Sequence, residues 1–593
     1  MEHQKSIIVL DFGGQYAHLI ARRVRQCGVY SEIMDADTPA EELKNAAGII
    51  LSGGPQSVYD SESPQGDPGI FDLAIPVFGI CYGLQWMVQA LGGTVSPGTV
   101  KEYGKAKLQL EHTDVKVLSD LPEEMTVWMS HGDAVSALPE GFMRIGKSDD
   151  CEFAFVAQTE KDLYGVQFHP EVVHTEYGQD LIKNFVSLCN AEPWNIGSYV
   201  KNIGDAIKEE VGDRKIFMMV SGGVDSTVAF VLINKILGTD RVQGLLVDTG
   251  MMRKDEVLLV GRAFEELGID NLRIEDASQY FLKKLVEVYE PEDKRWIIGD
   301  AFLSVQRRVS EEMGLTMDDG WMLGQGTIYP DTIETGETKN ADKIKTHHNR
   351  IPEIQKMMEE GFVIEPLRDL YKDEVRELGV ELGLPHDLVW RHPFPGPGLG
   401  VRILCAQSAS TIEEDLDIAI THAGLPVQSV GVQGDGRSYR HAVSLFTHEQ
   451  YPNEQCWNLA TSIPNQSSAF NRVLMCTSHA EVPEFVFTPG YVTMKRSDLL
   501  READALVHRI MYDAGFYADI WQFPVVLLPF GTSEGGQSIV LRPVESQEAM
   551  TANAAVIPEL ALKQMTKELL SLDGIDMVFQ DLTHKPPGTI EWE

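Results

Sequence analysis

Short apolar runs alternate with helical patterns along the first two thirds of the chain, and this alternation constrains the fold more than any other feature. Runs of this length suit strands that are buried on both faces of a sheet, and the segments between them carry apolar residues at helical spacing. Such alternation is typical of parallel sheets covered by helices. The predicted strands lie at residues 7–10, 48–51, 77–80, 216–220, 242–247, 272–274 and 321–323.

Two breaks divide the chain. Asn-Ala-Glu-Pro-Trp at 190–194 is typical of a linker, and residues 393–400 hold three prolines and three glycines, which excludes a helix interior. Later runs at 524–529 and 538–541 are rich in strand-forming residues. The sequence therefore predicts an α/β protein with two doubly wound parallel-sheet domains, at 1–195 and 196–396, followed by an α+β region at 397–593.

Composition limits the range of partners. The 593 residues include 89 acidic and 50 basic side chains, a net charge of −39, which argues against a nucleic-acid partner. No run approaches the roughly 18 apolar residues of a membrane helix, so we expect no membrane association. The seven cysteines are odd in number and form no Cys-x-x-Cys pair, which favours a reducing cytoplasm over a disulfide framework.

Cys81 stands between a predicted strand at 77–80 and a helical pattern, with Gly79 and Gly83 on either side. Small neighbours permit the sharp turn that exposes a nucleophile, and the helix N-terminus favours a thiolate. Taken alone, a buried cysteine in an ordinary β–α turn is the more common interpretation.

Three further segments bear on whether Cys81 is a structural cysteine or a nucleophile. His169 and Glu171 follow the strand-like run Gly165–Phe168 and could serve as a general base and the residue that orients it. The turn at 52–55, Ser-Gly-Gly-Pro, offers backbone N–H groups to an oxyanion. His131, in Ser-His-Gly-Asp at 130–133, is the rival base; the nearby glutamate favours His169.

These motifs, in this order, resemble the class I glutamine amidotransferases. The resemblance implies glutamine hydrolysis with Cys81 as nucleophile, His169 as base and Glu171 as its orienting residue. It also implies the following binding residues: the N–H groups of Gly54 and Tyr82 for the oxyanion, and Gln85 for the glutamine pocket.

A second predicted strand–loop–helix unit carries Ser-Gly-Gly-Val-Asp-Ser-Thr. Glycines and hydroxyls at a helix N-terminus make an anion cradle, and the absence of Gly-Lys-Ser/Thr separates it from the usual P-loop. The spacing resembles the pyrophosphate loop of the ATP pyrophosphatases. That resemblance implies ATP binding by Ser221, Gly222, Gly223, Val224, Asp225, Ser226, Thr227, Val247, Gln325 and Gly326, with Asp248 near the adenosine.

The polar segment from Thr332 to Lys345 is a candidate lid. Lys345 is predicted to place a cation near the α-phosphate; the adjacent His347 and His348 cannot point the same way on a regular element, which argues against zinc there. Because pyrophosphate leaves with high negative charge, Mg²⁺ is expected with ATP. Its candidate ligands are Asp225 and Asp331.

The final nine residues, Lys-Pro-Pro-Gly-Thr-Ile-Glu-Trp-Glu, carry rigid and bulky side chains where most chains fray. With segments at 294–299, 392–400, 431–437 and 541–544 they resemble the glutamine-hydrolysing GMP synthetase family over essentially the whole chain. The resemblance implies a ligase that adenylates XMP with ATP and aminates it with ammonia from glutamine. It implies XMP contacts at Arg295, Asp435, Gln522, Lys585 and Glu591.

Some features depart from the family pattern. Trp296 replaces a basic residue, Thr249 follows Asp248, and the stretch from about 441 to 537, which the shorter members lack, is predicted to be a folded insertion. A homodimer through the C-terminal region is a further expectation. Two alternatives remain open: a ligase with another acceptor, such as a deamido-dinucleotide or a tRNA base, and a non-enzymatic nucleotide-binding protein.

Overall fold

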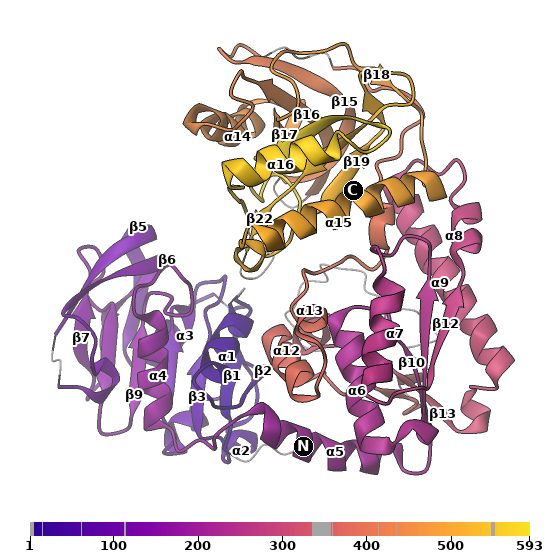
Figure 1. Ribbon diagram of the computed structural model, residues 1–593. Helices are drawn as coiled ribbons and strands as arrows, with labels where there is room; N and C mark the ends of the chain where they lie inside the picture. Colours follow the sequence, from indigo (N-terminus) through magenta and orange to yellow (C-terminus); the bar gives the residue numbers. More distant parts are fainter. Residues whose placement is uncertain are drawn as a thin grey trace. The chain divides into compact units, whose positions relative to one another are not determined.

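The computed structural model describes residues 5–14, 16–60, 62–111, 114–334, 357–358, 360–412, 414, 416–433, 436–546 and 552–593. The chain divides into two compact units (Figure 1). The first comprises residues 1–212, 327–360 and 365–381, and the second comprises 213–326, 361–364 and 382–593. The predicted domain boundaries come from breaks in the sequence pattern, whereas these two units are defined by their compactness, so those boundaries stay predictions.

The first unit is built on a sheet of nine strands in the order β2-β1-β3-β4-β9-β8-β7-β5-β6. Neighbours from β2 to β9 are parallel, as predicted, while those from β9 to β6 are antiparallel, which the sequence analysis does not foresee. The strands are β1 (Ile7–Asp11), β2 (Ser31–Asp35), β3 (Gly48–Leu51), β4 (Val77–Ile80), β5 (Thr94–Leu110), β6 (Glu124–Ala137), β7 (Met143–Lys147), β8 (Phe155–Gln158) and β9 (Leu163–Val166).

An apolar core lies on each face of this sheet. Successive residues of β1 alternate between the two cores, because side chains in a strand point to opposite faces. One core includes side chains of α1 and α4, and the other includes side chains of α2 and α3. The helices of this unit are α1 (Ala17–Arg25), α2 (Ala40–Leu43), α3 (Tyr82–Ala90), α4 (Gly178–Leu188), α5 (Ile196–Val211), α10 (Tyr329–Glu334) and α12 (Lys372–Glu381).

Arg25 explains why α12 belongs to the first unit. Its buried guanidinium donates to Glu374 at 2.8 Å and to the Ser31 carbonyl at 2.9 Å. The rings of Tyr30 and Tyr371 lie 4.3 and 5.0 Å from its central carbon. A buried charge paired and enclosed in this way fixes the packing of the helix.

The second unit holds the predicted second parallel sheet, in the order β12-β11-β10-β13-β14. Helix α6 follows β10 and is buried along ten of its residues, which accounts for its nearly continuous apolar sequence. The elements are β10 (Lys215–Met219), α6 (Val224–Leu237), β11 (Val242–Asp248), α7 (Glu256–Glu266), β12 (Leu272–Asp276), α8 (Ser278–Lys284), α9 (Pro291–Met313), β13 (Trp321–Gly324), β14 (Val363–Ile364) and α13 (His386–Val389).

The C-terminal part of this unit is a mixed sheet in the order β15-β16-β17-β24-β21-β19, with helices packed against it (Figure 1). Residues 441–537 contribute β17 and β19 to this sheet, as well as α14 and α15. The elements are β15 (Thr421–Gln433), β16 (Gly436–Phe446), α14 (Glu454–Gln466), β17 (Phe470–Cys476), α15 (Met494–Asp513), β19 (Val525–Leu528), β21 (Gln537–Leu541), α16 (Glu559–Leu569) and β24 (Ile575–Asp581).

Two short strand pairs complete the second unit, β18 (Val486–Phe487) with β20 (Phe530–Gly531) and β22 (Val544–Glu545) with β23 (Asn553–Ala554). Parallel α/β sheets followed by an α+β region confirm the predicted fold class. A search of the described helices finds none long and apolar enough to cross a membrane.

Candidate active sites

Cys81 lies at the junction of β4 and α3 in a strained backbone conformation, with φ of +51° and ψ of −104°. Non-glycine residues rarely adopt positive φ, and such strain is typical of functional turns. The flanking glycines make the turn possible. A Cβ on Gly79 would lie 2.7 Å from the Leu84 nitrogen, and one on Gly83 would collide with the Leu51 carbonyl oxygen.

His169 and Glu171 form a buried pair beside Cys81. The His169 Nδ1 lies 2.7 Å from the Glu171 Oε1, and the two residues are 5% and 0% exposed. Because Nδ1 donates to the carboxylate, Nε2 of the neutral ring is the atom that can accept a proton. Burial would lower the pKa of His169, but the Glu171 carboxylate and the Cys81 sulfur outweigh it and hold that pKa well above its ordinary value.

The Ser-Gly-Gly turn lies against this pair. A Cβ on Gly53 would meet the His169 Cε1 at 3.3 Å, and one on Gly54 would meet the Tyr82 ring at 2.9 Å. The two backbone segments predicted to bind the oxyanion, at Gly54 and Tyr82, are therefore adjacent. This arrangement suits attack by a thiolate on a carbonyl carbon.

Gln85 is buried on α3, and its Nε2 donates to the Asp133 carbonyl at 2.8 Å and to the Gln167 Oε1 at 3.2 Å. Gln167 is a contact that the sequence analysis misses; its Nε2 lies 3.7 Å from the Cys81 Sγ. Its position two residues before His169 is the signal that could have found it, because alternate residues of an extended segment share a face.

The rival base, His131, is held by other partners. Its Nδ1 lies 3.0 Å from the Asp133 carbonyl oxygen and its Nε2 lies 3.0 Å from the Glu102 Oε2. Both ring nitrogens are thus engaged away from Cys81, which favours His169 as the base.

The candidate ATP loop joins β10 to α6 in the second unit. Gly222 has a φ of +78°, and the Ser226 hydroxyl lies 3.0 Å from the Ser221 hydroxyl and 3.2 Å from the Gly223 carbonyl. The remaining predicted residues Val224, Asp225 and Thr227 occupy the first turn of α6. A loop of this kind at a helix N-terminus binds anions through backbone N–H groups and the helix dipole.

The neighbouring strand ends converge on this loop. A Cβ on Gly326 would lie 2.9 Å from the Ser226 Cα, so the residues after β13 pack directly against the loop. Gln325 is held by its backbone, which donates to the Ile364 carbonyl at 2.9 Å. Val247 is buried near the end of β11, and Asp248 closes the turn that follows by accepting from the Gly250 N–H at 2.8 Å.

Three of the predicted residues are not joined to a site by the structure. Lys345 and Asp435 lie outside the described residues. Asp331 lies in the first turn of α10 in the first unit, whereas Asp225 belongs to the second, so the pairing of Asp225 with Asp331 around a metal ion stays a prediction.

The C-terminal segment is packed into the second unit. Trp592 is fully buried and donates from Nε1 to the Asp581 Oδ2 at 3.0 Å. Gln522 donates to the Glu591 Oε1 at 3.1 Å, and Arg295 donates to the Glu593 main-chain oxygen. The structure thus gathers these predicted residues along the segment.

Lys585 lies at the start of the same segment and is half-buried. Its backbone pairs with Ala552, with N–H to O distances of 2.7 and 3.1 Å.

Arg402 is a further residue that the sequence analysis misses. It is fully buried and makes a two-pronged contact with Glu591, at 3.1 and 2.9 Å. The partners are 189 residues apart, and no local pattern reports such a pair.

Comparison with known proteins assigns families to three parts of the chain. The family model for class-I glutamine amidotransferases matches residues 8–189, that for NAD synthase matches 196–294, and that for the GMP synthase C-terminal domain matches 509–592. Fold, triad and loop thus define the class: an amidotransferase fused to an ATP-pyrophosphatase-type ligase.

Relatives extend over the full length. A probable glutamine-hydrolyzing GMP synthase of Leptospira interrogans is 48% identical, covering 99% of this chain and 99% of the relative. Glutamine-hydrolyzing GMP synthases of Macrococcus caseolyticus and Thermobifida fusca are 39% and 38% identical, covering 100% and 99% of this chain and 99% and 98% of the relatives. The chain belongs to the glutamine-hydrolysing GMP synthase family.

Proposed function

We propose that this enzyme converts XMP to GMP, using ATP to activate the acceptor and glutamine as the nitrogen donor. The observation that carries the proposal is an intact Cys81–His169–Glu171 arrangement in a chain that resembles GMP synthases along 99% of its length. A degenerate, purely nucleotide-binding protein would have no need to keep a buried, strained nucleophile.

In the glutaminase half-reaction, the Cys81 thiolate attacks the side-chain carbonyl of glutamine. His169 gives a proton to the departing ammonia and then takes one from the water that hydrolyses the glutamyl thioester. Glu171 orients the imidazole and offsets its positive charge. The N–H groups of Gly54 and Tyr82 stabilise the oxyanion, and Gln85 borders the substrate.

In the synthetase half-reaction, the C2 oxygen of XMP attacks the α-phosphorus of ATP and pyrophosphate leaves. Ammonia then attacks C2, and AMP departs with the oxygen. The loop Ser221–Thr227 would cradle the leaving pyrophosphate, and Val247, Gln325 and Gly326 would border the nucleotide. Lys345 would offset charge at the α-phosphate.

Mg²⁺ is the expected companion of ATP. Asp225 is half-buried in the first turn of α6, directly after the loop that holds the Gly223 carbonyl and next to Ser226. Carboxylate, hydroxyl and carbonyl oxygens suit a hard cation, and Asp331 is the second candidate ligand. The ion would neutralise part of the charge on pyrophosphate.

The acceptor would be held by the C-terminal part of the second unit, through Arg295, Asp435, Gln522, Lys585 and Glu591. Seven cysteines without a disulfide support a reducing cytoplasm as its location. A homodimer formed through this region stays a prediction.

A direct assay tests the proposal. Purified enzyme with ATP, Mg²⁺ and glutamine should release pyrophosphate and form GMP when XMP is supplied. Because the NAD synthase model matches residues 196–294, a deamido-dinucleotide is the comparison acceptor. Pyrophosphate release with the dinucleotide but not with XMP would overturn the acceptor assignment and leave the glutaminase intact.

A further inference from the structure

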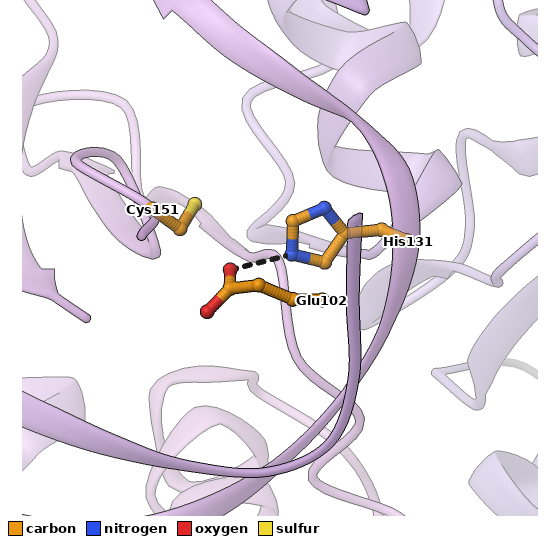
Figure 2. Close-up of side chains that lie close together, drawn as sticks. All are labelled: Glu102, His131 and Cys151. Atoms are coloured by element: carbon orange, nitrogen blue, oxygen red, sulfur yellow. Dashed lines mark hydrogen bonds and ion pairs between the residues drawn. The ribbon is translucent and has the colours of Figure 1, made fainter. Parts of the chain in front are cut away.

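A second cluster of reactive side chains lies in the first unit. Glu102 comes from β5, His131 from β6 and Cys151 from the loop between β7 and β8 (Figure 2). They are 9%, 6% and 2% exposed. One donor atom from each lies within 4.8 Å of the others, and in the described part of the chain no other such group of three histidine, cysteine or acidic residues occurs.

The two polar contacts of the His131 ring require a positively charged species between this ring and Glu102. Nδ1 lies 3.0 Å from the Asp133 carbonyl oxygen, which can only accept, so Nδ1 carries a proton. The neutral ring then directs the lone pair of Nε2 at the Glu102 Oε2, 3.0 Å away, and a carboxylate oxygen also only accepts. Two acceptors facing each other require a cation between them, either a proton or a metal ion.

The surroundings match a metal ligand set. Histidine ligands commonly donate the other ring N–H to a backbone carbonyl, as His131 does to Asp133. The second Glu102 oxygen accepts from the Ser148 hydroxyl at 3.1 Å, and that hydroxyl accepts from the Cys151 N–H at 3.0 Å. These contacts orient the carboxylate and the thiol-bearing loop toward one point.

We propose that Glu102, His131 and Cys151 form a binding site for Zn²⁺ or a similar divalent transition metal. Nitrogen, oxygen and sulfur donors together suit zinc, and three protein ligands leave a fourth position for water. Tetrahedral zinc with bonds of about 2.0–2.3 Å separates its ligand atoms by roughly 3.3–3.7 Å. The His131–Glu102 pair at 3.0 Å would therefore open slightly, and any pair nearer the 4.8 Å limit would close by about 1 Å. On binding, the Cys151 thiol loses its proton to solvent.

A cavity lies beside Glu102, one of the three proposed ligands. It has a volume of about 420 Å³, and it continues to the acidic pair Asp149 and Asp150. Carboxylates at a mouth raise the local concentration of cations. The same wall also carries Lys105 and Lys107.

The ion would cross-link β6, the strand that borders Cys81, to neighbouring segments. The neighbouring Ser130 carbonyl oxygen lies 3.8 Å from the Cys81 Sγ, and the Asp133 carbonyl accepts from Gln85 at 2.8 Å. A metal on His131 joins this strand to β5 and to the Cys151 loop. Because the ion binds the folded state, it raises the melting temperature.

Cobalt binding to the full chain tests the site. The Cys81→Ala background removes the reactive thiol, which could itself bind metal. Titration with Co²⁺ should give one equivalent with thiolate-to-cobalt charge-transfer absorption, displaced by Zn²⁺. Cys151→Ser should abolish that band, whereas Cys189→Ser, at a half-buried thiol of the same unit, should keep it.

Glu102→Gln is a second test variant, chosen because it should weaken metal binding without disturbing the fold. Its amide can donate to the His131 Nε2, so the fold keeps its hydrogen bond while cobalt affinity falls at least about 10–100-fold. Circular dichroism would show that each variant is folded. Absence of a thiolate–cobalt band in the background protein, or its survival in Cys151→Ser or at full affinity in Glu102→Gln, would overturn the proposal and leave a proton as the cation.

Discussion

At the scale of single residues, the protonation of His169 decides how the glutaminase works. Its Nδ1 is tied to Glu171 at 2.7 Å, and the carboxylate holds the pKa of the imidazole well above its ordinary value against the effect of burial. The imidazolium therefore persists to higher pH than that of an isolated histidine and can pair with the Cys81 thiolate. Activity that needs this pair should be lost only when the pH rises past the raised pKa.

Glu171→Gln tests this assignment. Without the carboxylate the pKa of His169 falls, so the alkaline limb of the glutaminase pH profile should move to lower pH. The kcat for glutamine hydrolysis should drop about 10²–10⁴-fold, because the imidazole loses its orienting partner. The profile is measured as glutamate formed from glutamine.

Glu176→Gln is the matched control, since this carboxylate of the same unit is exposed and accepts a hydrogen bond from the Thr126 N–H at 2.8 Å. It should leave rate and profile unchanged. An unshifted alkaline limb in Glu171→Gln would mean that Glu171 does not set the charge of His169.

At the scale of elements, the strand–turn–helix around Cys81 depends on missing side chains. Gly83→Ala would place a methyl group against the Leu51 carbonyl oxygen of the adjacent strand. Because backbone cannot yield as a flexible side chain does, we expect a loss of about 1–3 kcal/mol in unfolding free energy. Chemical denaturation of the full chain would measure it.

Gly299→Ala gives the opposite expectation. It lies inside α9 with open space around the added methyl group, so alanine should stabilise by about 0.5–1 kcal/mol. Equal effects of the two substitutions would show that the packing at Gly83 is not tight.

The loop before α6 provides a second test at this scale. A Cβ on Gly326 would approach the Ser226 Cα and nitrogen at 2.9 Å. Gly326→Ala should therefore displace the loop and slow pyrophosphate release about tenfold or more with either glutamine or ammonium as donor, while glutaminase activity persists. Normal pyrophosphate release in a folded Gly326→Ala enzyme would exclude close coupling between β13 and the loop.

Local sequence predicts those elements whose burial is uniform. Strands β1, β3, β4, β10 and β11 are short apolar runs because both their faces are covered. The apolar-run pattern does not predict the antiparallel half of the first sheet, since β6 alternates buried and exposed residues and β5 is long and polar. Such strands form through partners distant in the sequence.

In the candidate sites, too, local motifs can be predicted from the sequence, whereas contacts between distant residues cannot. Motif spacing predicts Cys81, His169 and the loop at 221–227, because strand ends and helix starts fix their local geometry. It does not predict Gln167 and Arg402, since their roles come from contacts across 86 and 189 residues. Tertiary packing sets those contacts, and a single sequence does not record it.

At the scale of the whole molecule, the proposed function requires an acidic chain to bind anionic substrates, and Lys585 of the C-terminal segment would supply a local cation. Trp592 is buried as expected of an anchor, and Arg402 holds Glu591. The net charge of −39 raises the importance of each well-placed lysine or arginine.

Lys585→Ala should raise the KM for XMP roughly 10- to 150-fold, the effect of losing one charge-assisted hydrogen bond, and leave the KM for ATP nearly unchanged. Lys567→Ala, on the exposed face of α16, is the control for net charge and should change neither. An unaltered KM for XMP in Lys585→Ala would remove Lys585 from the acceptor site.

The central claim is that one chain couples a glutaminase centred on Cys81 to an XMP-aminating ligase. Its most direct test is GMP formation by Cys81→Ala, measured with glutamine and with ammonium salts at fixed ATP and XMP. The account predicts that glutamine-dependent synthesis disappears while ammonium-dependent synthesis stays near the wild-type rate. Equal loss with both nitrogen donors, or persistence of glutamine-dependent synthesis, would contradict it.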